Sequence, residues 1–180
     1  MFYMFFAEGF EEVEAIATLD IIRRAGIEIK SVAIKDKIVT GSHGVPVVCD
    51  LVSDEITADE NLEGIILPGG MPGSKNLDKD ETVNKFIDYC NTNNKFLCAI
   101  CAAPFILGKR GILNGRKATC FPGFENELTG AKISDKFVCI DKNTITGRGM
   151  GSAVKFGLAI VSAVKGQSAA DKLEATLQCS

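Results

Sequence analysis

Lys95-Phe96-Leu97-Cys98-Ala99-Ile100-Cys101-Ala102-Ala103-Pro104-Phe105-Ile106-Leu107 is the stretch of sequence that decides the fold. An apolar segment typical of a strand leads, without a Gly/Asn loop, directly into an apolar segment typical of a helix. This pattern predicts a nucleophile elbow, a tight and often strained turn whose apical side chain stands clear of the backbone. Cys101 lies at the apex and is the candidate nucleophile. Unpaired amides and the positive end of the helix dipole favour an anion there, so we expect the Cys101 thiol to lean towards thiolate.

Segments typical of strands and helices alternate on both sides of this elbow. We expect strands at residues 2–6, 27–34, 64–67 and 95–100, and helices at residues 11–25, 81–91, 153–164 and 168–177. Two hairpins are expected at residues 37–49 and 136–146, and Pro46 marks the first hairpin as an edge element. The order predicts an α/β fold with an open, mostly parallel sheet, helices on both faces and a small edge hairpin.

Length and composition narrow the class of protein. A chain of 180 residues with 46% hydrophobic and 24% charged residues is expected to form a single domain, residues 1–180. Its 20 basic and 23 acidic residues are interspersed, which argues against nucleic acid as a partner. The apolar residues 1–6 have no basic flank and are too few for a signal peptide or a membrane span, so we predict a cytoplasmic protein without membrane contact.

The seven cysteines are an odd number, and several lie in apolar runs. This distribution predicts reduced thiols instead of a disulfide framework. Cys98 and Cys101 have C-x-x-C spacing, but Cys98 falls within the predicted strand, whereas redox pairs of this type lie at a helix start. Cys120 lies in a loop expected near the elbow, where it is either a resolving thiol or a passive cysteine.

Four segments that follow predicted strands carry the candidate chemistry. They are residues 11–14, residues 68–73, Cys101 and residues 147–151. Ligand sites in open parallel sheets lie beyond the carboxyl ends of the strands, so we expect these segments to converge on one crevice.

A thiolate that adds to a carbonyl group needs donors for the developing oxyanion and a group that moves protons. The amides of Gly69, Gly70 and Ala102 are the candidate donors. His43, the only histidine, falls in a predicted surface turn, which weakens a Cys-His dyad and with it a protease interpretation.

Glu14 is the candidate acid–base partner of Cys101. It follows the first strand by about a helical turn, and a carboxyl group desolvated beside a thiol has a raised pKa and donates a hydrogen bond to a thiolate. The alternatives are a solvated helix carboxylate for Glu14, a structural thiol for Cys101 and a simple tight turn for residues 147–149.

Four motifs together resemble the ThiJ/PfpI family, the family of the Parkinson-disease-associated protein deglycase, over essentially the whole chain. They are Glu11-Glu12-Val13-Glu14, Leu67-Pro68-Gly69-Gly70, Cys98-Ala99-Ile100-Cys101-Ala102-Ala103-Pro104 and Gly147-Arg148-Gly149. The resemblance implies a flavodoxin-like three-layer fold that is usually dimeric and has no metal or organic cofactor. It further implies an oxidisable cysteine matching Cys101, a partner glutamate matching Glu14, amides matching Gly69 and Gly70 that face the cysteine, and an arginine matching Arg148 near the site.

Two positions depart from the family pattern. Ala102 replaces the histidine that follows the cysteine in the peptidase branch, which argues against proteolysis. Phe121 replaces a histidine that the deglycase branch often carries before the loop proline. A catalytic step that depends on that histidine therefore has no equivalent residue at this position.

The functional prediction combines the residues with the resemblance. It is a cysteine-dependent, cofactor-independent glyoxalase or deglycase that acts on methylglyoxal-like 2-oxoaldehydes or glycated adducts. Cys101 adds to the aldehyde, and Glu14 moves a proton between adjacent carbons. The alternative is a redox-sensing or chaperone-like stress protein, in which oxidation of Cys101 replaces turnover.

Overall fold

A seven-stranded sheet forms the centre of this computed structural model, which describes residues 1–179. The strand order is β10-β11-β7-β6-β1-β2-β5, and every neighbouring pair is parallel except β10 with β11. The strands are β1 (Phe2–Phe6), β2 (Ile29–Ala33), β5 (Leu51–Val52), β6 (Gly64–Leu67), β7 (Phe96–Ile100), β10 (Val138–Asp141) and β11 (Thr144–Gly147). The mostly parallel α/β sheet predicted from the sequence is confirmed.

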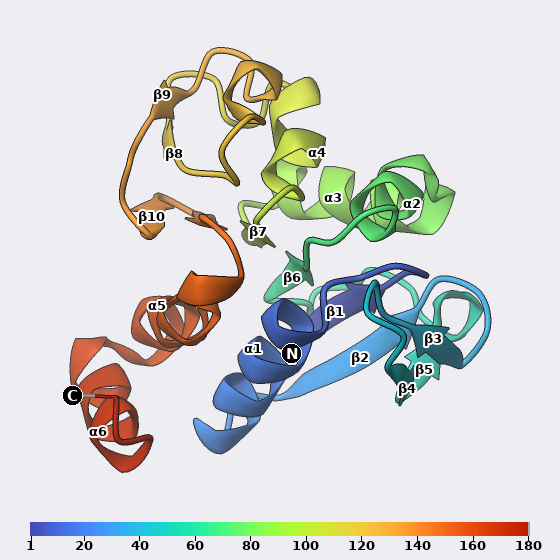
Figure 1. The fold of residues 1–180 in the computed structure, drawn as a ribbon, viewed down its shortest axis with the longest axis horizontal. Coiled ribbons are helices and arrows are strands. Elements are labelled where there is room, and N and C mark those ends of the chain that lie inside the picture. The colour runs from blue at the N-terminus through green and yellow to red at the C-terminus, as the bar shows by residue number, and fades with distance from the viewer. Residues whose placement is uncertain (180) are drawn as a thin grey trace.

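Two further strand pairs lie outside the central sheet. β3 (Ile38–Thr40) and β4 (Pro46–Val48) form the predicted antiparallel hairpin, which is a sheet of its own. β8 (Lys117–Ala118) and β9 (Lys132–Ile133) form a short parallel pair. In Figure 1 the segment from β8 to β10 stands at the end of the molecule away from the β3–β4 hairpin.

Helices cover both faces of the sheet (Figure 1). α1 (Glu12–Arg24), α5 (Ala153–Lys165) and α6 (Gln167–Thr176) lie on one face. α2 (Gly73–Lys79), α3 (Glu81–Thr92) and α4 (Pro104–Lys109) lie on the other. Short 3₁₀ helices occupy Ser53–Glu55, Glu125–Glu127 and Met150–Ser152.

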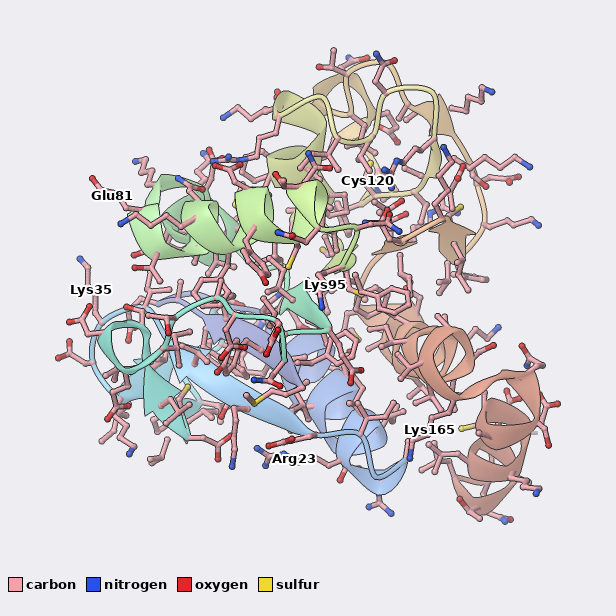
Figure 2. The ribbon with its side chains drawn as sticks, turned by 180° about the vertical axis from the view of Figure 1, so that it is seen from behind. Arg23, Lys35, Glu81, Lys95, Cys120 and Lys165 are labelled. Carbon is pink, nitrogen blue, oxygen red and sulfur yellow. The ribbon has the colours of Figure 1, made fainter. Side chains whose placement is uncertain are left out.

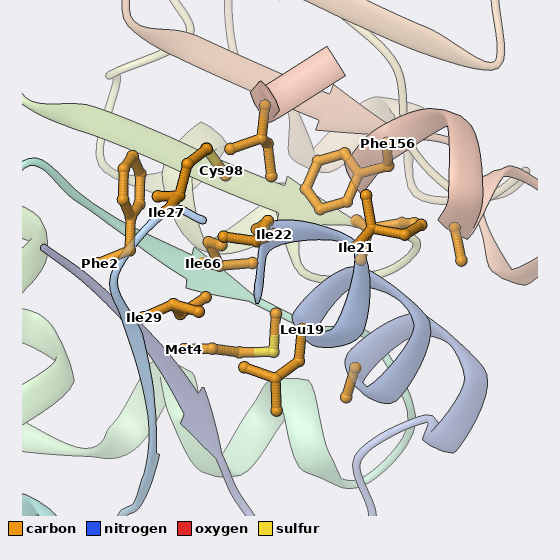
Figure 3. Packing of buried hydrophobic residues seen from close by; sticks show 14 of the residues in the cluster. Phe2, Met4, Leu19, Ile21, Ile22, Ile27, Ile29, Ile66, Cys98 and Phe156 are labelled. Carbon is orange, nitrogen blue, oxygen red and sulfur yellow. The ribbon is translucent and has the colours of Figure 1, made fainter. Parts of the chain in front are cut away.

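Alternation along β1 divides the core between the two faces. Phe2, Met4 and Phe6 belong to the core on the side of α1 and α5, and the close view in Figure 3 shows Met4 beside Leu19 of α1. Tyr3 and Phe5 point to the opposite face, where both rings meet the edge of Phe86. Successive strand residues alternate between faces, so this short apolar run supplies both cores. Each fully buried large side chain contributes about 1.5–3 kcal/mol, which fixes β1 in the middle of the sheet.

The sequence predictions missed α2, the strands β5, β8 and β9, and the three 3₁₀ helices. All of these elements are short, and none has enough residues for a periodic apolar pattern. Leu77 is the one large apolar side chain that α2 buries completely. The remaining strands and the longer helices agree with the sequence predictions within a few residues.

The helices among residues 1–179 include none that has both the length and the apolar character required to cross a membrane.

Candidate active site

Cys101 occupies the strained turn that the sequence predicted between β7 and α4. Its φ is +65°, a left-handed conformation that residues other than glycine seldom adopt. The Cys101 amide donates to the Gly147 carbonyl at 2.9 Å, and the Cys101 carbonyl accepts from the Phe121 amide at 2.8 Å. These two contacts, from the end of β11 and from the loop after β8, hold the backbone in this conformation.

Glu14 reaches the same place from the first turn of α1. The Glu11 side chain caps this helix by accepting from the Glu14 amide at 2.7 Å. The Glu14 side chain is 1% exposed, and its Oε2 accepts from the Gly69 amide at 2.9 Å. The Cys101 side chain lies next to this carboxyl group, and the interaction between them changes the pKa of both groups. Glu14 Oε1 is buried and has no hydrogen-bond partner among residues 1–179.

The environment keeps Glu14 partly protonated near neutral pH. Burial is the main cause that raises its pKa to about 7, while the interaction with the Cys101 thiol lowers it. The nearby charge of Glu11 raises the pKa further, and the Gly69 amide opposes this. A carboxyl group of this kind can both donate and accept a proton at pH 7.

The expectation of a lowered Cys101 pKa is wrong. Burial and then the Glu14 carboxylate raise the pKa of this thiol, whereas the Ala102 and Gly70 amides act in the opposite direction. α4 has six residues and starts only at Pro104, so its dipole is weak at Cys101. Two negative charges this close are unfavourable, and the thiol and carboxyl groups therefore retain one proton between them.

Gly69 and Gly70, which follow β6, have different roles in the site. The Gly70 amide, like that of Ala102, lies near the Cys101 thiol and lowers its pKa. The Gly69 amide is engaged by Glu14, so the prediction that it serves as an oxyanion donor is corrected: it positions the carboxyl group. A Cβ on Gly69 would lie 2.3 Å from Glu14 Oε2 and 2.6 Å from the Cys101 Cβ. Only glycine fits between the two side chains.

Phe121 and Gly149 border the thiol. A Cβ on Gly149 would lie 3.2 Å from the Phe121 ring and 4.0 Å from Cys101 Sγ. The ring and the sulfur therefore both lie next to the Gly149 backbone, which carries no side chain. Phe121 is 48% exposed and forms an apolar rim at the position where the family pattern suggested a histidine. The Gly147-Arg148-Gly149 motif is recognisable in the sequence, but nothing in the motif marks Gly149 as the residue that faces the thiol.

Arg148 and Cys120 lie in a neighbouring pocket instead. The Arg148 guanidinium donates to the Asp135 carbonyl at 3.1 Å, and Arg148 and Cys120 both line a pocket whose lining does not include Cys101. Cys120 is 4% exposed, and burial raises the pKa of its thiol to about 11. Cys98 is completely buried in β7, as the sequence predicted, which argues against a C-x-x-C redox pair with Cys101.

One cluster within the described chain has metal-ligating side chains. Ligand atoms of Glu11, Glu12 and His43 lie within 4.8 Å of one another. His43 is exposed in the turn of the β3–β4 hairpin, as expected, and its Nδ1 lies 3.0 Å from Glu12 Oε2. Glu12 also accepts from the His43 amide at 2.7 Å, so this cluster is explained by the attachment of the hairpin to α1.

Fold and site together define an α/β protein with a cysteine at the elbow after a central strand and a buried glutamate beside it. A profile of the DJ-1/PfpI family matches residues 2–163. The chain belongs to the DJ-1/PfpI family.

Three comparisons illustrate this relationship. "Protein DJ-1 homolog B" of Arabidopsis thaliana is 32% identical over 174 residues, which cover 95% of this chain and 40% of the plant protein, so this chain spans less than half the relative's length. "Deglycase PYRAB04690" of Pyrococcus abyssi is 30% identical over 144 residues, covering 79% of this chain and 86% of that protein. The structure described as "Toxoplasma gondii DJ-1, oxidized" has a TM-score of 0.93 and 30% identity, covering 98% of this chain and 97% of that one.

Proposed function

We propose that the protein is a cysteine-dependent, cofactor-independent enzyme of the glyoxalase or deglycase type. Its substrates are 2-oxoaldehydes such as methylglyoxal, or their glycated adducts. The observation that carries this proposal is the buried Glu14 carboxyl group, with a pKa of about 7, which lies across Gly69 from the Cys101 side chain. The deglycase-named relative from Pyrococcus abyssi supports the same chemistry.

The geometry suggests the order of steps. The Cys101 sulfur adds to the aldehyde carbon of methylglyoxal, and the aldehyde oxygen takes the proton that the Cys101–Glu14 pair holds. The ionised Glu14 then removes the proton from this carbon, and the ketone oxygen takes up a proton, which gives an enediol. Return of a proton to the neighbouring carbon, with loss of the proton from the first hydroxyl group, leaves a thioester. Water hydrolyses the thioester, which releases lactate and restores the thiol. The net reaction adds one water to methylglyoxal.

The pocket donors fit the charge that develops. The Gly70 and Ala102 amides lower the pKa of the thiol, so they favour negative charge on the sulfur or on an oxygen attached beside it. Phe121 provides an apolar rim over the short carbon chain of the substrate.

The test is lactate production from methylglyoxal with a metal chelator present and no added cofactor. We expect turnover in the wild type and its loss in Cys101→Ser. Cys179→Ser is the matched control because Cys179 is an exposed free cysteine, and this variant should keep the wild-type rate. A wild-type rate no higher than that of Cys101→Ser would overturn the proposal.

The second candidate function is redox sensing through Cys101. This cysteine is only partly buried, and the Ala102 and Gly70 amides, which lower the pKa of its thiol, would stabilise a sulfinate. Peroxide would oxidise the thiolate to sulfenic acid with release of hydroxide, and a second equivalent would give sulfinic acid. Cys98 and Cys101 fall on the same peptide, so tandem mass spectrometry after peroxide treatment should place two added oxygens on Cys101 and none on Cys98. Equal oxidation of the two cysteines would contradict this candidate.

We also propose a homodimer and a cytoplasmic location. Exposed apolar side chains lie on α1 and on the β3–β4 hairpin, and Glu12 ties these two elements together. The side chains are Val13, Ile16, Ile38, Val45 and Val48. A patch of this kind favours association. Light scattering should give the mass of two chains for the wild type and of one chain for Val48→Lys.

A further inference from the structure

The pocket that Cys120 and Arg148 line has the character of a binding site. It has a volume of about 700 Å³ and is built from the segment that joins β8, β9 and β10. Figure 2 shows Cys120 among the side chains of this segment, on the far side of the molecule from Arg23. Its lining side chains include four cations, namely Lys117, Lys132, Lys136 and Arg148.

These cations lack carboxylate partners. Within residues 1–179, none of the four takes part in an ion pair. The Arg148 contact is with a backbone carbonyl, that of Asp135. Two carboxylates, Glu125 and Asp135, also line the pocket, but Glu125 is engaged by the Gly123 amide at 2.7 Å. The pocket therefore carries a positive excess, although the whole chain has a net charge of −3.

Apolar side chains share the pocket with these cations. Ile133 of β9 and Ile140 of β10 are 48% and 49% exposed, and Val138, also on β10, lines the pocket with them. A bare inorganic ion would leave these side chains in contact with water. A small organic molecule with one anionic end would cover them while its charge meets the lysines and the arginine.

We infer that this pocket binds a small organic molecule that bears an oxyanion, either a phosphate or a carboxylate. The Arg148 guanidinium and the Lys132 and Lys136 ammonium groups hold the oxyanion, and Ile133 and Ile140 contact the organic part. The site is separate from the Cys101 thiol, although Arg148 and Cys120 each directly precede a residue that borders this thiol. The binding therefore does not depend on the proposed catalytic function.

The test uses three probes that share one ring: phenyl phosphate, benzoate and uncharged benzyl alcohol. Titrations are followed by calorimetry and by the amide resonances of Ser134 and Arg148. We expect saturable binding of at least one anion and none of benzyl alcohol. Binding of phenyl phosphate alone assigns phosphate, and binding of benzoate assigns a carboxylate. Binding of neither anion, or equal binding of the alcohol, overturns the proposal.

Variants connect the binding to the pocket. Lys132→Glu/Lys136→Glu should weaken anion binding by about tenfold or more, because charge-assisted hydrogen bonds and their attraction are lost. Lys85→Glu/Lys172→Glu makes the same change in net charge at exposed residues of α3 and α6 outside the pocket, and it should bind as the wild type does. Equal losses in both double variants would show a non-specific charge effect and overturn the site. Cys101→Ser should bind normally, so failure of the catalytic proposal remains distinguishable.

Discussion

Glu12 and Glu14 lie two residues apart in the first turn of α1 but have opposite surroundings. The Glu12 carboxylate accepts hydrogen bonds from the β3–β4 turn, and although burial raises its pKa, the contacts with His43 lower it to about 2. The Glu14 carboxyl group faces the elbow, where burial raises its pKa to about 7. Residues i and i+2 of a helix point to different sides. The surroundings of each carboxyl group, and not its residue type, thus decide which one attaches a hairpin and which one can move protons.

The largest expected effect is the difference in turnover between variants of Glu14 and Glu12. Glu14→Gln should lower lactate formation from methylglyoxal by about 10²–10⁴-fold, because the amide cannot move the proton. Glu12→Gln makes the same chemical change next to the hairpin and should leave kcat close to the wild-type value. Steady-state kinetics of both variants measures the difference. Similar losses in the two would mean that Glu14 has no special part in the reaction.

A smaller loss of turnover should follow when Gly69, which contacts Glu14, is changed. In Gly69→Ala the new Cβ overlaps Glu14 Oε2 and the Cys101 Cβ, so the two groups must move apart. We expect turnover to fall by about 10²-fold, the cost of misplacing a reacting group by about 1 Å. Gly151→Ala is the control, since nothing lies within 4 Å of its Cβ position. Unchanged kinetics in Gly69→Ala would contradict the close contact.

The pH dependence of activity should follow Glu14. Below about pH 7 the Cys101–Glu14 pair gains a second proton, and the form with one shared proton disappears. We therefore expect kcat/KM for methylglyoxal to fall as the pH is lowered through about 7. A flat profile between pH 5 and pH 8 would show that the carboxyl pKa is not raised.

The free energy of unfolding should also depend on the titration of Glu14. The native pKa of Glu14 exceeds its ordinary value of 4.5, so between pH 4.5 and about 7 the folded protein binds more protons than the unfolded chain. The contribution of Glu14 to the free energy of unfolding therefore falls as the pH rises through this window. Glu14→Gln should be more stable relative to the wild type at pH 8 than at pH 4.5. Urea denaturation at both pH values measures this, and a constant difference would be the contrary result.

The smallest expected effect belongs to Glu12. Glu12→Gln should lower the free energy of unfolding at pH 7 by about 1 kcal/mol, because charge-assisted hydrogen bonds to the hairpin are lost. The native pKa of Glu12 is depressed, so its contribution exists above pH 4.5 and disappears as the pH falls towards about 2. The wild type and the variant should therefore converge in urea denaturation between pH 7 and pH 3. If the difference in stability between the wild type and the variant is the same at pH 3 as at pH 7, the Glu12 carboxylate is not its source.

The sequence predicted the sheet and the location of the site because both depend on local pattern. Apolar runs identify the central strands, and the direct passage from strand to helix identifies Cys101 as the apical residue of the elbow. Short elements such as α2 contain too few residues for a pattern to emerge. Their formation depends on packing between segments distant in the chain.

The electrostatics of the site could not be predicted in the same way. The sign of the Cys101 pKa shift depends on a carboxylate that is distant in the sequence, on burial and on the length of α4. Likewise, the sequence could not show that Gly69 contacts Glu14 instead of an oxyanion, or that Arg148 lines the pocket next to the thiol. Each of these depends on the three-dimensional packing of loops around the ends of the strands.

The left-handed conformation of Cys101 has a consequence for the stability of the fold. A residue with a Cβ costs about 1–2 kcal/mol in this region of conformational space, and glycine does not incur this steric cost. The backbone at position 101 therefore favours glycine over the cysteine that occupies it. The proposed function offers a reason for the cysteine, because it requires a thiol at the apex of the turn.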